Sequence, residues 1–123
     1  MSIRSLAVLG AIVVFAATAP PGWSQESQGT ILGRITDSSN LVVPDASIEL
    51  TNVATAATTR TVSNAAGNYS APFLVPGTYR VTVKKTGFKT VVRTDVVLNL
   101  NDRLEINVPL DVGTTSDTIT VLP

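Results

Sequence analysis

The chain has 123 residues, and 9 Lys and Arg balance 9 Asp and Glu, so its formal net charge is zero. A neutral chain lacks the basic surface that attracts nucleic acids, so we expect no nucleic acid partner. The sequence contains neither Cys nor His, which excludes disulfides, thiolate nucleophiles, the usual zinc sites and imidazole bases. Most enzyme mechanisms thereby lose their central residue, and the length suits one domain.

The amino terminus, residues 1–24, has the features of a secretory signal peptide. Arg4 precedes an apolar run from Leu6 to Ala17, and a Pro-Pro-Gly triplet then interrupts the run. A small residue stands at Ser24 and another two positions before it, as signal cleavage requires, so we expect the mature chain to begin at Gln25. The alternative is a membrane anchor, but the apolar run is shorter than the roughly 20 residues that span a bilayer.

Alternating apolar residues predict the first two strands of the mature chain. In Thr30–Asp37, Gly33 falls on the inward face, where its missing side chain leaves room for another backbone or for a ring. Tyr69 or Tyr79 could supply that ring. After a turn, Ala46–Val53 alternates in the same way.

The segment Asn64–Val83 predicts a β-hairpin. Its first turn ends at Gly67, and alternation then places Tyr69 and Phe73 on the inward face. Pro76-Gly77 predicts the reversal into the second strand, because Pro fixes φ and Gly accepts the left-handed conformation.

The remaining strands lie in two longer runs. Phe88–Leu100 exceeds the usual strand length, so we expect a bulge or break within Arg93–Asp95, with the inward face continuing to Leu100. Leu104–Leu110 alternates as the last strand of the domain, and Pro109 marks it as an edge.

Seven short strands, one of them in the Thr-rich Ala54–Val62, predict an all-β fold, a seven-stranded antiparallel β-sandwich over residues 28–112. Residues 113–123 follow as a linker and an extended tail. The run 117–121 has no obvious partner strand, so we predict that it pairs with an exposed sheet edge of a partner protein. The candidate docking residues are Asp117, Thr118, Ile119, Thr120 and Val121. The alternative is an ordinary edge strand.

The turn motifs resemble those of the carboxypeptidase regulatory-like domain. The motifs are Gly33-x-Ile35-x-Asp37, Pro44-x-Ala46-x-Ile48-x-Leu50, Ala66-Gly67-Asn68-Tyr69, Val75-Pro76-Gly77-Thr78-Tyr79-x-Val81 and Gly87-Phe88. The resemblance covers roughly Gln28 to Val112 and implies a transthyretin-like sandwich. It also implies an accessory module without catalytic residues and without a cofactor.

The tail resembles a particular setting of this domain. Val112-Gly113 followed by Ser116–Val121 is similar to the junction in Oar-like TonB-dependent outer-membrane receptors, where the module precedes a plug and barrel. The resemblance implies an exported protein of the periplasm or outer membrane, or a secreted one. It implies a protein partner in the cell envelope, TonB or the receptor's own plug and barrel, and a solitary module of the same lineage is the alternative.

The remaining polar and basic residues suit ordinary structural roles. The oxygen-bearing residues Asp37, Asp45, Asn99, Asn101 and Asp102 have no calcium-loop spacing, so turn chemistry accounts for them better and we expect no metal site. The basic residues Lys84, Lys85, Lys89 and Arg93 suit a solvated face.

Carbohydrate binding is the second functional hypothesis. Sugar sites expose aromatic rings, whereas the inward phase of Tyr69, Phe73 and Tyr79 assigns these rings to the core. The sequence therefore predicts little surface on which a sugar could stack.

The signal peptide gives the first testable prediction. Mass spectrometry of the protein from the cell envelope should find Gln25 as the first residue, because the small residues before it suit signal peptidase. An intact amino terminus in that fraction would contradict the prediction.

Overall fold

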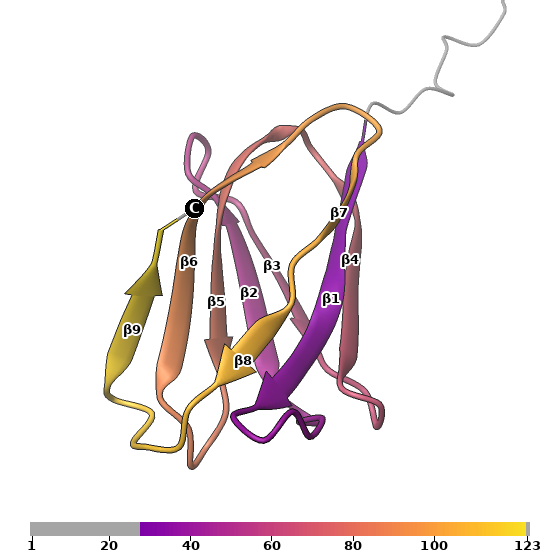
Figure 1. The fold of residues 1–123 in the computed structure, drawn as a ribbon. Helices are drawn as coiled ribbons and strands as arrows, with labels where there is room; N and C mark the ends of the chain where they lie inside the picture. The colour runs from indigo at the N-terminus through magenta and orange to yellow at the C-terminus, as the bar shows by residue number, and fades with distance from the viewer. Residues whose placement is uncertain (1–27, 123) are drawn as a thin grey trace, which may run out of the picture.

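The computed structural model describes residues 28–122, which form two β-sheets packed face to face (Figure 1). The expected signal peptide lies outside these residues. Within the described part, no helix is long and apolar enough to cross a membrane. The strands are β1 (Gly29–Asp37), β2 (Ser47–Asn52), β3 (Thr58–Val62), β4 (Asn68–Leu74), β5 (Gly77–Lys84), β6 (Thr90–Leu98), β7 (Arg103–Glu105), β8 (Val108–Leu110) and β9 (Thr118–Val121).

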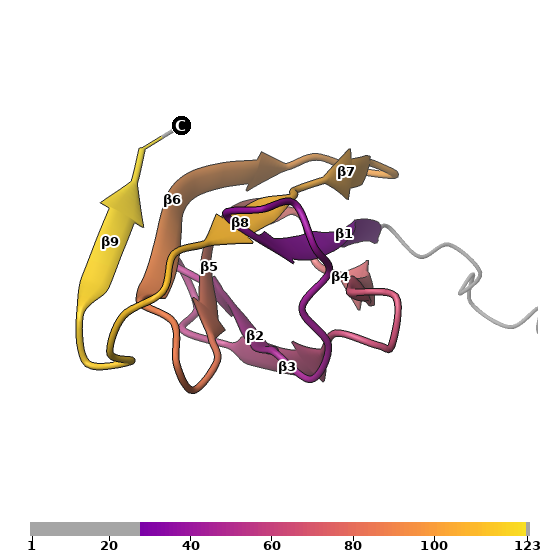
Figure 2. The ribbon, with the colours of Figure 1, turned by 60° about the horizontal axis from the view of Figure 1, so that its bottom comes forward.

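One sheet has the order β3-β2-β5-β6-β9, and the other has the order β4-β1-β7 with β8 paired further along β1. Figure 2 shows β2 and β3 on one side of the sandwich and β1 and β8 on the other. The predicted all-β sandwich is confirmed, but the described residues form nine strands rather than seven. The sheets are also mixed, because β7 and β8 run parallel to β1 and β9 runs parallel to β6. Two parallel neighbours must be joined by a crossover connection, and here the chain forms strands of the other sheet between each parallel pair.

The core lies between the two sheets and follows the predicted alternation. Its largest fully buried side chains come from both layers: Ile31, Ile35, Ile48, Leu50, Val81, Val83, Leu98, Val108 and Leu110. Burying one such side chain stabilises the fold by roughly 1.5–3 kcal/mol before conformational entropy is subtracted. The period of two along each strand therefore identifies most of the core correctly.

The predicted hairpin is wrong, because its two strands lie in different sheets. β4 pairs with β1, whereas β5 pairs with β2 and β6. Val75-Pro76 is instead the crossover between the sheets, and the Tyr79 hydroxyl donates a 2.6 Å hydrogen bond to the Val75 carbonyl. This bond resembles the tyrosine corner of other sandwiches. A Pro-Gly pair sets a change of direction, but it does not decide which strand the next segment pairs with.

The bulge predicted in the long Val-rich run is confirmed. Tyr79 pairs with Val96 but Val81 pairs with Arg93, so β6 carries one extra residue, and Asp95 there has a φ of 57°. The expected inward position of Leu100 is wrong, since β6 ends two residues earlier and Leu100 is exposed.

The predicted last strand is split into β7 and β8 by a tyrosine. The Ile106 amide donates to the Leu32 carbonyl at 2.7 Å, and in an unbroken parallel ladder the Arg34 amide would next donate to the Ile106 carbonyl. Instead the Tyr69 hydroxyl donates to that carbonyl at 2.7 Å. The displaced Arg34 amide donates to the Asn107 Oδ1 at 2.9 Å.

Gly33 makes this arrangement possible, as the sequence predicted. A Cβ at this position would lie 1.9 Å from the Ile106 carbonyl oxygen and 3.1 Å from the Tyr69 ring. The ring that fills the space beside Gly33 is therefore that of Tyr69. Burial raises the pKa of Tyr69, so its phenol keeps the proton that it donates.

The Tyr69 hydrogen bond gives a prediction about stability. Tyr69→Phe should lower the free energy of unfolding by about 1–2 kcal/mol, because the Ile106 carbonyl would lose its donor in a buried place. Denaturant unfolding measures the change, and Ser70→Ala, an exposed neighbour on the same strand, should shift it by no more than about 0.5 kcal/mol. Equal stability of Tyr69→Phe and the wild type would contradict the proposed importance of this bond.

Candidate functional site

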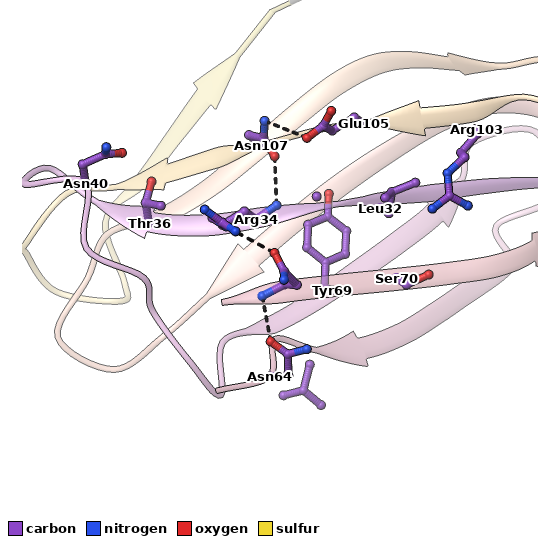
Figure 3. Close-up of a pocket in the computed structure, with 13 residues that line it drawn as sticks. Leu32, Arg34, Thr36, Asn40, Asn64, Tyr69, Ser70, Arg103, Glu105 and Asn107 are labelled. Atoms are coloured by element: carbon purple, nitrogen blue, oxygen red, sulfur yellow. Dashed lines mark hydrogen bonds between the residues drawn. The ribbon is translucent and has the colours of Figure 1, made fainter. Parts of the chain in front are cut away.

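A groove of about 830 Å³ lies over the outer face of the β4-β1-β7 sheet (Figure 3). Strand alternation positions its walls, since residues that point away from the core point into the groove. Most of the lining is polar. The side chains that face it include Arg34, Asn68, Ser70, Arg103, Glu105 and Asn107.

The amides of the groove are already engaged within the fold. Asn107 accepts from the Arg34 amide and donates to the Glu105 carboxylate at 3.3 Å. Asn68 accepts from Arg34 Nε at 3.2 Å, and Asn64 accepts from the Asn68 amide at 3.0 Å, as Figure 3 shows. These bonds maintain the turn and the broken ladder.

A second, smaller cleft of about 160 Å³ lies at the end of the sandwich where β4 crosses over to β5. The crossover and the β2–β3 turn meet at this end (Figure 1). The cleft is lined by Asn52, Thr55, Ala57, Thr59, Phe73, Leu74, Val75 and Tyr79.

Phe73 stands at the mouth of this cleft, contrary to its predicted place in the core. Gly29 pairs with Leu74 but Ile31 pairs with Ala71, so β4 carries one extra residue near its end. The bulge puts Leu74 into the core and leaves Phe73 76% exposed with a φ of 61°. The prediction failed because one extra residue inverts the phase of a strand. Pro72 was a usable signal, since Pro within a strand indicates an edge or a bulge.

Asn52 forms the floor of the cleft, although no sequence pattern singles it out. Its side-chain oxygen accepts from the amides of Ala54 at 3.0 Å and Thr55 at 3.3 Å, which fixes the orientation of the amide group. Its Nδ2 then points the other way, 3.0 Å from where a Cβ of Gly77 would lie. Among residues 28–122, Nδ2 has no protein acceptor, and Asn52 as a residue is 4% exposed. The fully buried side-chain atom without a partner in this part of the chain is Thr94 Oγ1, so Nδ2 keeps contact with solvent and water can accept its hydrogen bonds.

The predicted docking residues lie at the far edge of the five-stranded sheet. The expectation that they lack a partner strand is corrected, because Thr118–Val121 pairs with Thr90–Arg93 of β6 (Figure 1). Asp117 precedes the strand, and its carbonyl accepts from the Thr90 amide at 2.8 Å. β9 is thus an edge strand, and its second edge has no partner among the described residues.

The candidate calcium ligands serve turns, as expected. Asp37 Oδ1 accepts from the Ser39 and Leu41 amides, and Asp102 Oδ2 accepts from the Asn99 amide. Asp45 and Asn101 have φ of 58° and 62°, respectively, which Asp and Asn tolerate in tight turns. In residues 28–122, no three His, Cys, Asp or Glu side chains gather as a metal site would require.

The basic residues also have structural contacts. Arg93 donates to the Asn107 carbonyl at 3.3 Å, across the sandwich from its own sheet. The Lys89 stem packs against Gly113, and the Lys89 amide donates to the Asp111 carbonyl. Lys84 lies at the end of β5 and is exposed, as is usual for a solvated face.

Comparison with known proteins identifies the domain. Residues 30–111 match the family model described as the carboxypeptidase regulatory-like domain. Comparison with curated proteins gave no match.

Solved structures share the fold at low sequence identity. A candidate carbohydrate-binding protein from Bacteroides uniformis matches with a TM-score of 0.56 and 18% identity, over 67% of this chain and 40% of that one. A type II cohesin–X-dockerin complex from Acetivibrio cellulolyticus contains a chain that matches with a TM-score of 0.56 and 19% identity, over 68% of this chain and 58% of that one.

A dioxygenase domain from Streptomyces sp. SirexAA-E matches with a TM-score of 0.57 and 11% identity, over 76% of this chain and 86% of that one. The chain spans only 40% of the length of the carbohydrate-binding protein and 58% of the length of the matching chain in the cohesin–X-dockerin complex. At such identities the likeness shows the fold alone.

The conformation of Phe73 gives a prediction that separates backbone strain from loss of the ring. Phe73→Gly should be more stable than Phe73→Ala by about 1 kcal/mol, because Gly adopts positive φ without a Cβ clash and Ala does not. Thermal and denaturant unfolding of the two variants measure the difference. If the Ala variant were the more stable one, the left-handed conformation at position 73 would be contradicted.

Proposed function

The chain belongs to the carboxypeptidase regulatory-like domain family, and we propose that it acts as a non-catalytic binding module of an exported protein. Domains of this family are accessory modules. More specifically, we propose the amino-terminal extension of a TonB-dependent outer-membrane receptor, or a solitary relative of that extension. The edge strand β9 is the observation that carries this proposal.

The side chains of the described part support a binding role over catalysis. With no His or Cys in the sequence, a Ser or Thr nucleophile would need Lys, Asp or Glu as its base. Among the titratable groups of residues 28–122, Tyr69 has a shifted pKa, and its hydroxyl donates a hydrogen bond to the Ile106 carbonyl. The likeness to a dioxygenase domain concerns the fold and brings no reacting group with it.

The free edge of β9 has the geometry for strand addition. The Thr90 amide donates to the Asp117 carbonyl, so in a regular parallel ladder the amides of Ile119 and Val121 face β6. The amides and carbonyls of Thr118 and Thr120 then face away from the sheet. An extended segment of a partner can pair with these groups through main-chain hydrogen bonds.

We take the partner to be in the cell envelope, with the periplasmic domain of TonB as the first candidate. That choice is motivated by the resemblance of residues 112–121 to a receptor junction and by the signal-peptide features of residues 1–24. Strand addition at β9 leaves the sandwich intact, so the module can dock without unfolding. A plug and barrel continuing from the same reading frame is the alternative partner.

The β9 edge gives a prediction with a matched control. Thr120→Pro removes an amide that faces the partner but none that faces β6, so it should weaken binding to the periplasmic domain of TonB at least tenfold. Thr120→Ala keeps the amide and should bind like the wild type. Isothermal titration calorimetry measures both affinities, and thermal unfolding checks that the variants are folded.

Two outcomes would contradict this proposal. Equal affinities of Thr120→Pro and Thr120→Ala would show that the β9 edge is not the contact. Absence of binding by the folded wild type would reject TonB as the partner.

A further inference from the structure

We propose that the cleft beside Phe73 binds one pyranose ring of an uncharged glycan. This inference goes beyond the docking role of β9, because the cleft lies by β3 and β4, at the opposite side of the sandwich from β9. It rests on the shape and chemistry of the cleft, and the Bacteroides likeness contributes the fold alone.

Phe73 supplies the stacking surface that a sugar needs. The exposed ring is held outward by the bulge in β4, and the backbone accepts an unfavourable positive φ to keep it there. Strain of this kind is concentrated at ligand sites, where the surrounding structure enforces it. The C–H face of a pyranose is apolar, so it can lie on an aromatic ring as an aliphatic group does.

Asn52 supplies a polar group to the same cleft. Its Nδ2 carries two donors without an acceptor among the described residues, while its Oδ1 is engaged by the β2–β3 turn. A sugar hydroxyl is an acceptor of the required kind and can enter a narrow cleft. Such a hydroxyl would replace water as the acceptor of Nδ2.

The remaining lining restricts the class of ligand. Among residues 28–122, no charged side chain lines the cleft, so an anionic sugar would find no counter-charge from them. Thr59 adds a hydroxyl on the adjacent wall, and Leu74, Val75 and Tyr79 add apolar surface. At about 160 Å³ the cleft is smaller than the roughly 300–1,000 Å³ of pockets that enclose whole ligands, so it can take part of one sugar ring beside Phe73 but not an extended peptide. These properties together favour a neutral pyranose over a peptide or an acidic glycan.

The groove over the β4-β1-β7 sheet is the competing location for a glycan. It is larger, but it contains Arg34, Arg103 and Glu105, and the side-chain amides of Asn68 and Asn107 bond to Arg34 and Glu105. The aromatic residue among its described lining, Tyr69, is buried. The two locations make different predictions, since an acidic glycan suits the groove and a neutral one suits the cleft.

The test is a titration of the full chain, labelled with nitrogen-15, with cellohexaose, xylohexaose, mannohexaose and hexagalacturonate. At least one neutral hexasaccharide should bind saturably and shift the amide resonances of residues 52–59 and 72–79. Hexagalacturonate should bind at least tenfold more weakly than that sugar.

Three variants test the two contacts separately. Phe73→Gly removes the ring while relieving the backbone, so it should lose at least tenfold in affinity without losing stability. Phe73→Trp keeps a stacking surface and should bind at least as well as the wild type. Asn52→Asp keeps the acceptor for the turn but removes the free donors, so it should lose about tenfold in affinity if it remains folded. Val97→Ala, an exposed change on β6, is the control and should bind normally.

Three results would overturn the proposal: no saturable binding of any neutral hexasaccharide, unchanged affinity in Phe73→Gly, or resonance shifts confined to the groove. None of these bears on the docking role of β9, which Thr120→Pro tests through a different partner. If a variant lost TonB binding but still bound the sugar, the proposal for the cleft would stand.

Discussion

The hydrogen bond from the Tyr69 hydroxyl to the Ile106 carbonyl is the contact on which the smaller sheet depends. It joins β4 to the chain between β7 and β8, across the central strand β1. It requires Gly33 beneath the ring, because any side chain there would overlap the Ile106 carbonyl. It also requires Asn107, whose side chain replaces the carbonyl that the Arg34 amide has lost. Gly33, Tyr69 and Asn107 lie far apart in the sequence, but each is needed where the hydrogen-bond ladder between β1 and the β7–β8 segment is interrupted.

Much of the sandwich could be predicted from the sequence because its information is local. Alternation identified Ile31, Ile48 and Val81 as core, and turn chemistry identified Gly67, which has a φ of 78°. The close approach at Gly33 was also predictable, since a Gly on the inward face of a strand often marks a place where another backbone comes near. Alternation does not indicate which strands pair with each other. The sequence therefore predicted a hairpin turn at Pro76-Gly77, where the structure has a crossover between the sheets at Val75-Pro76.

The candidate sites were harder to predict from the sequence, because they also depend on contacts between distant segments. The bulge in β4 adds one residue after Ala71, so alternation that correctly places Ala71 in the core wrongly places Phe73 there too. The free donors of Asn52 depend on which acceptors surround Nδ2 in space, and no local pattern encodes those. For β9, the extended conformation was predictable from its residues, but the pairing with β6 depends on a long-range return of the chain.

Each of the two proposed sites includes an edge strand of the sandwich, β4 for the cleft and β9 for the docking site. An edge strand exposes unpaired backbone groups, and natural proteins cover, twist or use them. In β4 the bulge twists the edge and turns Phe73 outward, which converts a potential pairing edge into the wall of a cleft. In β9 the strand remains regular over its four residues, so its outer backbone groups stay available for pairing. The cleft is lined from β2, β3 and β5 as well as β4, and β9 lies at the opposite edge of the five-stranded sheet from β3. The fold can therefore place a docking edge and a small-ligand cleft at opposite edges of one sheet.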